Sequence, residues 1–569
     1  MQTFRNLHSA VIKIITVLLC RLFLIGSLAN LSNAEPIGWL NWRGPERNGA
    51  SKEAGLVDIV EVDGKNHLWS YELSGRGTPV VSGNRVYALG YRGKGPDLQE
   101  ILVCLDSESG KALWQLGFND FLSDVIYERY SIGSPAVDTE TGNVYILTSP
   151  GILACVSPSG EILWNVSMME EYGRLTFPNG RTGSPVVEGD LVIVNAITCN
   201  WGAEGPARNR FYAFQKKTGE LVWSSTPGET PKDSSFSTPV LAWSDGKRVF
   251  YCGTGCGNVV CINARTGDPI WRFKMSKGGV NSSVVLDRKD RLIAIHGQEN
   301  VDSSETGRMV AIRLDAKPTA SEEGAPVLGP EAEIWRNPLC MFTSSPVIVN
   351  DRVYQLVDTG KLSCVDAETG KILWEKKLAD SQLHASPLYA DGKLYVPMLD
   401  GALYILRPSD EGAETLCSVK LEGNCLGSPC VWDGRIYVHT TSKLYCFGSG
   451  QGSKLDTPAE PLVRTPDVGE ATRLQALPSE VLMHPGDRLS VDVFGLDANG
   501  NRTGRMTDVT WKKFIPPTAK VKSEMDAAFD PSGELVAPEN ARLSAGAFQV
   551  TNGAGLVGTI RGRIFPVCP

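Results

Sequence analysis

One pattern recurs along this chain and constrains its fold more than any other feature. A Ser/Thr-Pro or Ser-Ser pair precedes two short apolar runs that are separated by a Gly/Asp/Asn turn, as in 345–354. Two β-type runs across a short polar turn predict a β-hairpin. The first and last prolines are 350 residues apart over seven intervals, a mean repeat of 50 residues. The eight pairs are Thr78-Pro79, Ser134-Pro135, Ser184-Pro185, Thr238-Pro239, Ser282-Ser283, Ser345-Pro346, Ser386-Pro387 and Ser428-Pro429.

A second motif follows the hairpin in most repeats. At 104–114 it contains a small apolar residue, an Asp, a Gly and a final Trp, and it returns at 213–223, 261–271 and 364–374. The Asp or Asn caps a turn and the Gly supplies a positive φ, so the motif predicts a third strand, a turn and a fourth strand. The large Trp side chain suits packing against the next unit. The predicted docking residues are Trp69, Trp114, Trp164, Trp223, Trp271, Trp335 and Trp374.

Four strands per repeat at this period are typical of a β-propeller blade. The eighth repeat ends after its third strand, at 444–447, whereas 67–73 has the Trp-bearing pattern of a fourth strand with no strands before it. Pairing these two segments would close the ring and remove an open sheet edge. The sequence therefore predicts an all-β fold, an eight-bladed β-propeller over 67–448 that is closed by an N-terminal strand.

Several cysteines occupy the same position in successive repeats. Five of the 14 occupy the small apolar position of the third strand, so we expect them to be buried free thiols. Cys252, Cys256 and Cys261 lie close together in the sequence and leave two alternatives, one disulfide or, less favoured, a metal site. Since no His stands at ligand spacing from them, we predict packing and no metal. The five repeat-position residues are Cys104, Cys155, Cys261, Cys364 and Cys446.

Residues 1–34 have the features of an export signal. A cationic start and a short apolar run end in Ser32-Asn33-Ala34, a small-residue cleavage site. The alternative is an uncleaved anchor over 11–28, but Lys13 and Arg21 interrupt that span. We therefore expect an exported protein of the periplasm or the extracellular space, with no transmembrane segment after signal cleavage.

Charge and motifs exclude several functions. The formal net charge is −8, which is a poor surface for a phosphate backbone, so nucleic acid is not an expected partner. The sequence has no His-Glu-x-x-His metalloprotease motif and no Gly-x-Ser-x-Gly nucleophile elbow. The Gly-rich run 253–257 stands between two predicted strands without a following Lys or helix, which favours a hairpin turn over a phosphate loop. No residue is assigned a catalytic role.

Two further regions flank the predicted propeller. Residues 35–66 form an N-terminal extension that contains the motif Trp42-Arg43-Gly44-Pro45. Residues 449–470 are rich in Gly, Ser, Pro and Thr and are predicted to be a linker. Short alternating β-runs over 471–569 predict a small β-sandwich. Residues 477–511 within it resemble bacterial Ig-like domains, which implies a binding or spacing module or a sandwich with no partner.

The Trp motif at 364–374 and the extension at 42–49 resemble the pyrroloquinoline-quinone-like (PQQ-like) propeller repeat family. The resemblance implies the propeller fold over about 39–448. One branch of the family, the quinoprotein alcohol dehydrogenases, holds PQQ and Ca²⁺ and has a ring made by adjacent cysteines. This sequence has no Cys-Cys dipeptide and no Cys-x-x-Cys-His haem motif. It is therefore more similar to the BamB-like, non-catalytic branch.

Residues just before each Ser/Thr-Pro pair are expected to gather at one mouth of the propeller channel, where the innermost strands begin. Three arginines near aromatic side chains could bind a carboxylate-rich molecule such as PQQ. The alternative is that they are solvated turn cations or pair with acids such as Glu128. The candidate rim residues are Arg76, Arg129, Arg181, Phe236, Asn281, Phe342 and His384.

These observations lead to two functional hypotheses. The first is an exported, non-enzymatic propeller that acts as a binding scaffold for protein or cell-envelope polymer through its loops. The alternative is a PQQ-binding oxidoreductase, a PQQ-dependent dehydrogenase if it is an enzyme at all. Fold alone does not choose between them, because a propeller supports many functions.

Overall fold

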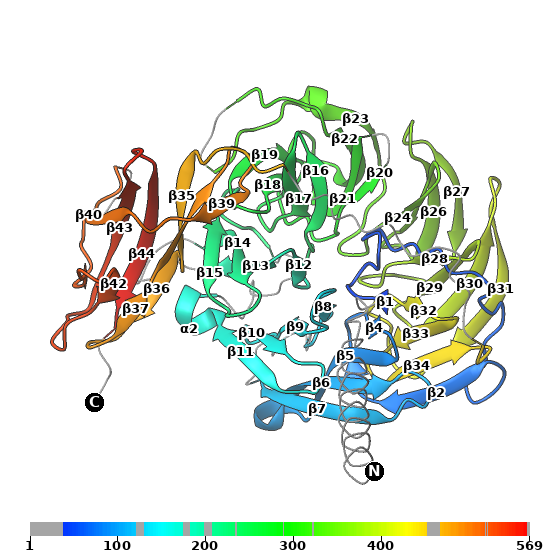
Figure 1. Cartoon of the computed structure of the whole chain (residues 1–569). Helices are drawn as coiled ribbons and strands as arrows, with labels where there is room; N and C mark the ends of the chain where they lie inside the picture. The colour runs from blue at the N-terminus through cyan, green and yellow to red at the C-terminus, as the bar shows by residue number, and fades with distance from the viewer. Residues whose placement is uncertain are drawn as a thin grey trace, which may run out of the picture.

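The computed structural model describes residues 38–120, 130–174, 183–198, 207–233, 236–287, 290–320, 324–451, 467–517, 519 and 522–565. Among these residues the regular elements are almost all β-strands (Figure 1). The exceptions are the short helix α2 and two 3-10 turns. The predicted all-β class is confirmed. The three exceptions are α2 (Met168–Tyr172), η1 (Gly95–Asp97) and η2 (Pro330–Ala332).

The described residues from 38 to 448 form eight antiparallel sheets. The first is β1 (Gly38–Trp39), β3 (Ser74–Gly75), β4 (Val80–Ser82), β5 (Arg85–Arg92), β6 (Gln99–Asp106) and β7 (Ala112–Asn119). The second is β8 (Ala136–Val137), β9 (Val144–Leu147), β10 (Ile152–Val156) and β11 (Ile162–Ser167). The third is β12 (Val186–Glu188), β13 (Leu191–Thr198), β14 (Arg208–Gln215) and β15 (Leu221–Ser225). The fourth is β16 (Val240–Ser244), β17 (Lys247–Gly253), β18 (Asn258–Asn263) and β19 (Pro269–Lys274).

The remaining four sheets follow in chain order around a common centre (Figure 1). The fifth is β20 (Val285–Asp287), β21 (Arg291–Glu299), β22 (Thr306–Arg313) and β23 (Glu333–Asn337). The sixth is β24 (Val347–Val349), β25 (Arg352–Leu356), β26 (Lys361–Asp366) and β27 (Ile372–Lys377). The seventh is β28 (Leu388–Ala390), β29 (Lys393–Pro397), β30 (Ala402–Pro408) and β31 (Ala413–Lys420). The eighth is β32 (Cys430–Trp432), β33 (Arg435–His439), β34 (Lys443–Gly448) and β2 (His67–Glu72).

The last sheet takes its outer strand from the start of the chain. β2 pairs antiparallel with β34, and Trp69 lies opposite Cys446. The pairing predicted from the incomplete eighth repeat is present. It covers an edge of β34 that would otherwise expose unpaired backbone groups.

The repeated Ser/Thr-Pro pair links neighbouring sheets by hydrogen bonds. In each repeat the backbone N–H of the Ser or Thr donates to the side-chain hydroxyl of the equivalent residue in the next sheet, over 2.8–3.1 Å. The last bond runs from Ser428 back to Thr78, so the cycle closes. In the fifth repeat the equivalent residue is Ser283 rather than Ser282, which corrects the alignment of that repeat by one residue. The cycle is Thr78, Ser134, Ser184, Thr238, Ser283, Ser345, Ser386 and Ser428.

The motif tryptophans connect the outer strands of neighbouring sheets. The Trp69 indole donates to the carbonyl of Ser107 in the turn of the first sheet, over 3.0 Å. A Cβ at Gly110 in that turn would lie 2.5 Å from the Trp69 ring, so the ring packs on a residue that can only be Gly. Trp271 is buried in the core between the fourth and fifth sheets. The other indole donors and acceptors are Trp114 to Pro158, Trp164 to Lys216, Trp223 to Ala264, Trp335 to Ala367 and Trp374 to Ser409.

All eleven cysteines within the described residues are free thiols. The five at the repeat position are buried, as predicted. Cys252, Cys256 and Cys261 are also free, so the disulfide alternative for this group is wrong. Burial raises the pKa of the Cys252 thiol to about 12, which keeps it protonated and unreactive at neutral pH.

The C-terminal residues from 467 to 565 form three further sheets. The first is β35 (Arg473–Leu477), β38 (Asp492–Leu496) and β39 (Arg502–Arg505). The second is β36 (Glu480–Met483), β44 (Val557–Ile564), β43 (Ser544–Asn552) and β40 (Val509–Phe514). The third is β37 (Arg488–Ser490), β42 (Glu534–Val536) and β41 (Ala528–Phe529). Most of the predicted linker, 452–466, lies outside the described residues.

These C-terminal sheets contact the third and fourth sheets of the ring, beside β14 and β15 (Figure 1). Arg502 pairs with Asp190 over 3.0 Å, and the Asn263 amide donates to the carbonyl of Asn499 over 2.9 Å. The backbone N–H of Ser479 donates to a carbonyl of β15 over 2.7 Å. Apolar, ionic and backbone contacts together fix the position of the C-terminal sheets on the ring.

Candidate functional site

The residues that precede the innermost strands include three aromatic rings that meet across the channel. Phe236, Phe342 and His384 come from the starts of the fourth, sixth and seventh sheets. The Phe236 ring centre lies 6.2 Å from that of Phe342 and 5.7 Å from that of His384. Phe342 and His384 are 6.2 Å apart, so each ring contacts the other two. The sequence predicted these residues at one mouth, and the structure brings them together as an aromatic cluster.

Hydrogen bonds from neighbouring polar side chains fix the position of this aromatic cluster. The Asn281 side-chain oxygen accepts from the backbone N–H of Phe236 over 3.2 Å, and Asn281 is almost fully buried. The Thr343 hydroxyl lies 2.6 Å from the carbonyl of Leu383 and 2.6 Å from Nδ1 of His384. These contacts hold the rings in place. Asn281 therefore positions a neighbouring sheet rather than standing free in the channel.

Of the three arginines predicted at this mouth, one lies within the described residues. Arg76 lies 5.4 Å from the ring centre of Tyr91 and donates to its hydroxyl over 3.1 Å. Tyr91 in turn packs edge-on against Tyr130, with 5.6 Å between ring centres. Arg76 is thus held by aromatic stacking, a reason for Arg rather than Lys at this position. Arg129 and Arg181 lie outside the described residues.

A buried carboxylate that the sequence analysis missed lies between the first and second sheets. Glu100 accepts hydrogen bonds from the backbone N–H groups of Ser131 and Ser149, over 2.7 and 3.0 Å. Burial raises the pKa of Glu100 to about 7, and the nearby carboxylate of Asp120 also raises it. The signal that could have revealed it is a lone acid in the otherwise apolar run 100–105.

The opposite end of the channel is occupied by the N-terminal extension. The Arg43 guanidinium donates to the carbonyl of Pro387 over 3.2 Å, to that of Asn48 over 2.9 Å, and to that of Pro346. Both prolines follow the Ser/Thr cycle along the innermost strands, whereas the rim residues precede it. Burial without a paired carboxylate lowers the pKa of Arg43 to about 9.

Other residues of this extension attach it around the same end. β1 pairs with β4, and the carbonyl of Leu40 accepts from Val137 in the second sheet. Ala50 forms a parallel bridge with Tyr389 in the seventh sheet. The Glu53 carboxylate accepts from two backbone N–H groups in the turn of the eighth sheet, over 2.7 and 2.9 Å. The sequence predicted an extension at 35–66, and the contacts of its described residues between 38 and 53 lie across one end of the ring.

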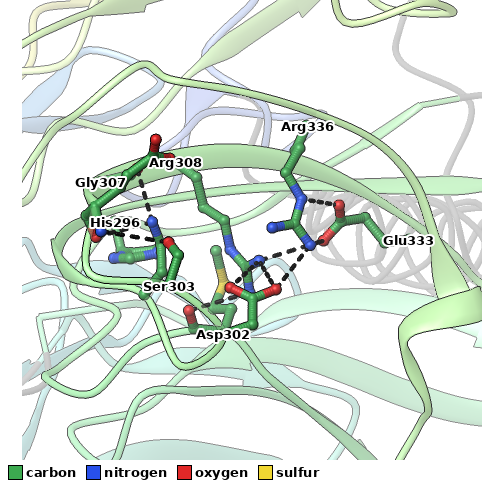
Figure 2. Close-up of polar contacts among 10 residues, drawn as sticks. His296, Asp302, Ser303, Gly307, Arg308, Glu333 and Arg336 are labelled. Atoms are coloured by element: carbon green, nitrogen blue, oxygen red, sulfur yellow. Dashed lines mark hydrogen bonds and ion pairs between the residues drawn. The ribbon is translucent and has the colours of Figure 1, made fainter.

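A dense polar network lies in the fifth sheet, around Arg308 and Asp302 (Figure 2). Arg308 pairs with Asp302 over 3.1 Å, and Arg336 pairs with the same carboxylate over 2.9 Å and with Glu333. Burial and the charge of Arg308 lower the pKa of the adjacent His296 to about 4, so this ring is neutral at physiological pH. Two cations balance two carboxylates, which is the composition of a structural network that fixes the 299–306 connection.

Two kinds of feature are absent from the described part of the chain. No group of three or more His, Cys, Asp or Glu side chains there could hold a metal ion. No helix among those residues is long and apolar enough to cross a membrane.

The fold and the channel define a propeller-like protein built from PQQ-like repeats. A family model described as outer membrane protein assembly factor BamB matches residues 50–198, 97–330 and 328–415. The chain belongs to this family. The superfamily implied by the sequence motifs is confirmed.

Curated and solved proteins agree with this assignment at low identity. Outer membrane protein assembly factor BamB of Burkholderia pseudomallei (strain K96243) is 23% identical over 399 residues, which cover 67% of this chain and 90% of that protein. The quinohemoprotein alcohol dehydrogenase of Comamonas testosteroni superposes with a TM-score of 0.53 at 14% identity, over 78% of this chain and 84% of that one. A europium-containing methanol dehydrogenase gives 0.52 at 13% identity, over 73% and 99%. The two structural similarities concern the fold alone.

Proposed function

We propose that this chain is an exported, non-enzymatic binding scaffold, built on an eight-bladed β-propeller. The observation that carries the proposal is that the chain's own side chains occupy both ends of the channel. Arg43 and the segment around it occupy one end, and the rings around Phe236 occupy the other. A ring held in this way offers its outer surfaces and loops to partners.

The eight-bladed count is supported by eight sheets and by a hydrogen-bond cycle of eight members that returns to Thr78. We further propose the segments predicted from the sequence: a signal peptide at 1–34, an extension at 35–66, the propeller at 67–448, a linker at 449–470 and an Ig-like sandwich at 471–569. The sandwich is supported by its layered sheets, in which Trp511 stacks on Phe529 with 4.0 Å between ring centres.

The family supports the cell envelope as the setting and a protein as the partner. We infer that the chain binds proteins of outer-membrane assembly, because its family is that of the outer membrane protein assembly factor BamB. Export follows from the proposed signal peptide, and no nucleic-acid partner is expected of a chain with a net charge of −8.

The alternative is a PQQ-binding oxidoreductase, which the polar groups of Arg76 and His384 at the mouth favour. The described residues fit this planar tricarboxylate poorly. Rings whose centres lie 5.7–6.2 Å apart leave no space for a second aromatic plane between them. Arg76 is already stacked on Tyr91.

Two assays on the full-length chain separate these functions. Chemical crosslinking in the envelope of a Gram-negative host, followed by purification of the chain, is expected to yield a reproducible partner protein. Incubation with PQQ and Ca²⁺ is expected to give neither a bound chromophore nor dye reduction with primary alcohols. A stoichiometric chromophore with alcohol-dependent dye reduction would overturn the scaffold proposal in favour of the alternative.

A further inference from the structure

The C-terminal residues 467–565, here called the C-terminal module, have a hydrophobic core of their own. The buried cluster that contains Val481 and Ile560 consists of module residues alone. Among the described residues, one cluster extends across the contact with the ring, through Leu477 and the partly buried Phe494. Most of each core therefore lies on one side of the contact. Because a contact of this kind resembles a transient interface between proteins, the ring and the module can separate while each stays folded.

Arginines of the module supply charged contacts to the ring. Arg502 pairs with Asp190 over 3.0 Å, and Arg473 pairs with Asp268. In both pairs the guanidinium belongs to the module and the carboxylate belongs to the ring. Salt screens ion pairs at a solvent-accessible contact, so this docking depends on ionic strength. Two further arginines donate to uncharged oxygens of the ring, Arg561 to the Ser224 hydroxyl over 2.9 Å and Arg563 to the Glu171 carbonyl over 2.8 Å.

The module covers an aliphatic side chain and part of a strand edge in the third sheet. Val222 is 2% exposed, whereas Leu113 and Leu163, which also precede a docking Trp in the first and second sheets, are each 50% exposed. The backbone N–H of Ser479 donates to the carbonyl of Leu221 over 2.7 Å. The module thus hides an apolar side chain at a position that is half exposed in two other sheets.

These contacts lie on one continuous surface of the ring, because a single module touches all of them. The module also packs closely there, since a Cβ at Gly500 would lie 2.5 Å from the Thr266 side chain. Two carboxylates, a strand edge and a covered aliphatic side chain fit an extended segment that carries guanidinium groups. We call the ring residues that the module contacts the β15 surface: Asp190, Leu221, Val222, Ser224, Asn263 and Asp268.

We propose that the C-terminal module is a reversible cap on the β15 surface, and that an arginine-bearing extended segment of a partner protein displaces it. Partner guanidinium groups would pair with Asp190 and Asp268, and the partner main chain would take the place of Ser479 at β15. The contacts of the module show which chemistry this surface accepts. The reversible docking stands without the scaffold function, whereas the use of the surface by a partner rests on it.

Salt titration of the unaltered full-length chain tests whether the docking is reversible. Raising the salt concentration from about 0.1 M to about 1 M shortens the screening length from about 10 to about 3 Å. We expect the radius of gyration to rise in small-angle scattering and the Ser479 amide to exchange faster, while the amides of β43 keep their protection. An unchanged value of either quantity would overturn the cap.

A matched pair of variants tests the charge complementarity. Arg502→Glu places a carboxylate opposite Asp190 and should speed exchange of the Ser479 amide at least about tenfold at low salt. Arg505→Glu lies on the same strand, β39, but its partner Asp492 belongs to the module, so this control should leave the exchange unchanged. Equal acceleration by both variants, or by neither, would contradict the proposal.

A peptide probe tests the β15 surface for partner binding. The probe is a capped nine-residue peptide of alternating Arg and Val, added to the full chain at low salt. It should bind Arg502→Glu at least about tenfold more tightly than the wild type, because the cap no longer competes and the β15 surface is unaltered. Binding should slow hydrogen exchange at the amides of 221–225. Arg505→Glu should bind the peptide as the wild type does.

The charge of the β15 surface has its own readout. Asp190→Asn and Asp268→Asn, both introduced into the Arg502→Glu chain, should weaken peptide binding at least about tenfold, because two guanidinium contacts lose their charged partner. The same peptide with Lys in place of Arg should bind more weakly, since an ammonium cannot form the forked pair. Equal peptide binding to the wild type and Arg502→Glu, exchange protection away from 221–225, or unchanged binding to the Asn variant would overturn the proposal.

Crosslinking in the cell separates this inference from the scaffold function. A photoreactive residue at position 222 is expected to capture the C-terminal module in the wild-type chain and an envelope protein in the Arg502→Glu chain. If position 222 of Arg502→Glu captures none of the partners that other positions capture, the partner surface is wrong and the scaffold stands. If no position captures an envelope protein, the scaffold fails and the use of the β15 surface fails with it.

Discussion

At one end of the central channel the Arg43 guanidinium donates to the carbonyls of Pro346 and Pro387, whose sheets lie far away in the sequence. At the other end three aromatic rings around Phe236 pack against one another. The first closure depends on a desolvated charge whose donors must all be satisfied, whereas the second depends on apolar contact area. The two ends of one channel are thus closed by two kinds of interaction, and these should tolerate amino-acid substitution to different degrees.

The largest loss of stability is expected from substitutions at the Arg43 end of the channel. Arg43→Ala should lower the free energy of unfolding by about 4 kcal/mol, because buried carbonyls lose charged donors and the extension loses its anchor. Arg43→Lys should recover little of this loss, since one ammonium cannot reproduce the fork of a guanidinium. Denaturant unfolding of the purified chain measures both variants. Full recovery with Lys would show that charge alone, not geometry, closes this end.

The next largest change in stability is expected at Glu100, which is buried between the first and second sheets. The pKa of Glu100 is about 7 in the folded chain and about 4.5 in the unfolded chain. Between these two pH values the folded chain keeps the carboxyl proton, whereas the unfolded chain has released it. The stabilising contribution is therefore present at low pH and is lost as the pH rises from about 4.5 to 7. Unfolding of the wild type and of Glu100→Gln should diverge over this window by on the order of 3 kcal/mol. Parallel pH profiles would contradict the burial argument.

A smaller effect is expected for the aromatic cluster itself. Phe236→Leu should cost about 1 kcal/mol, because an apolar side chain of similar volume keeps most of the contact area. Thermal unfolding followed by circular dichroism measures the change. A loss as large as that of Arg43→Ala would show that ring geometry, and not area, closes this end.

The smallest effect is expected for Arg76, which is partly exposed and stacked on Tyr91. Arg76→Ala should change the free energy of unfolding by less than about 1 kcal/mol, the range of an exposed cation–π pair. If Arg76 instead belongs to a ligand site, added PQQ would stabilise the wild type and not this variant. Thermal shifts with and without PQQ distinguish the two results.

Much of the ring could be predicted from the sequence because its signals are local and repeated. In 104–114, 261–271 and 364–374 the Asp or Asn, the Gly and the Trp lie within eleven residues, and the turn at Gly110 must leave space for Trp69. The pairing of β2 with β34 was predicted because an incomplete repeat at one end matched a surplus strand at the other. The Ser/Thr cycle was visible as a repeated pair, although its hydrogen bonds were not.

The sequence by itself determined the strands, the repeat and the need to close the ring. The reason is that the repeat period and the turn-forming residues can be recognised from residues close together in the chain. Only the tertiary structure decided which groups meet in the channel and which rim edges are covered. Arg43 binds carbonyls about 300 residues away, and a carbonyl is present at every residue, so no side-chain pattern marks the acceptors. The same reason hid the contact of Ser479 with β15.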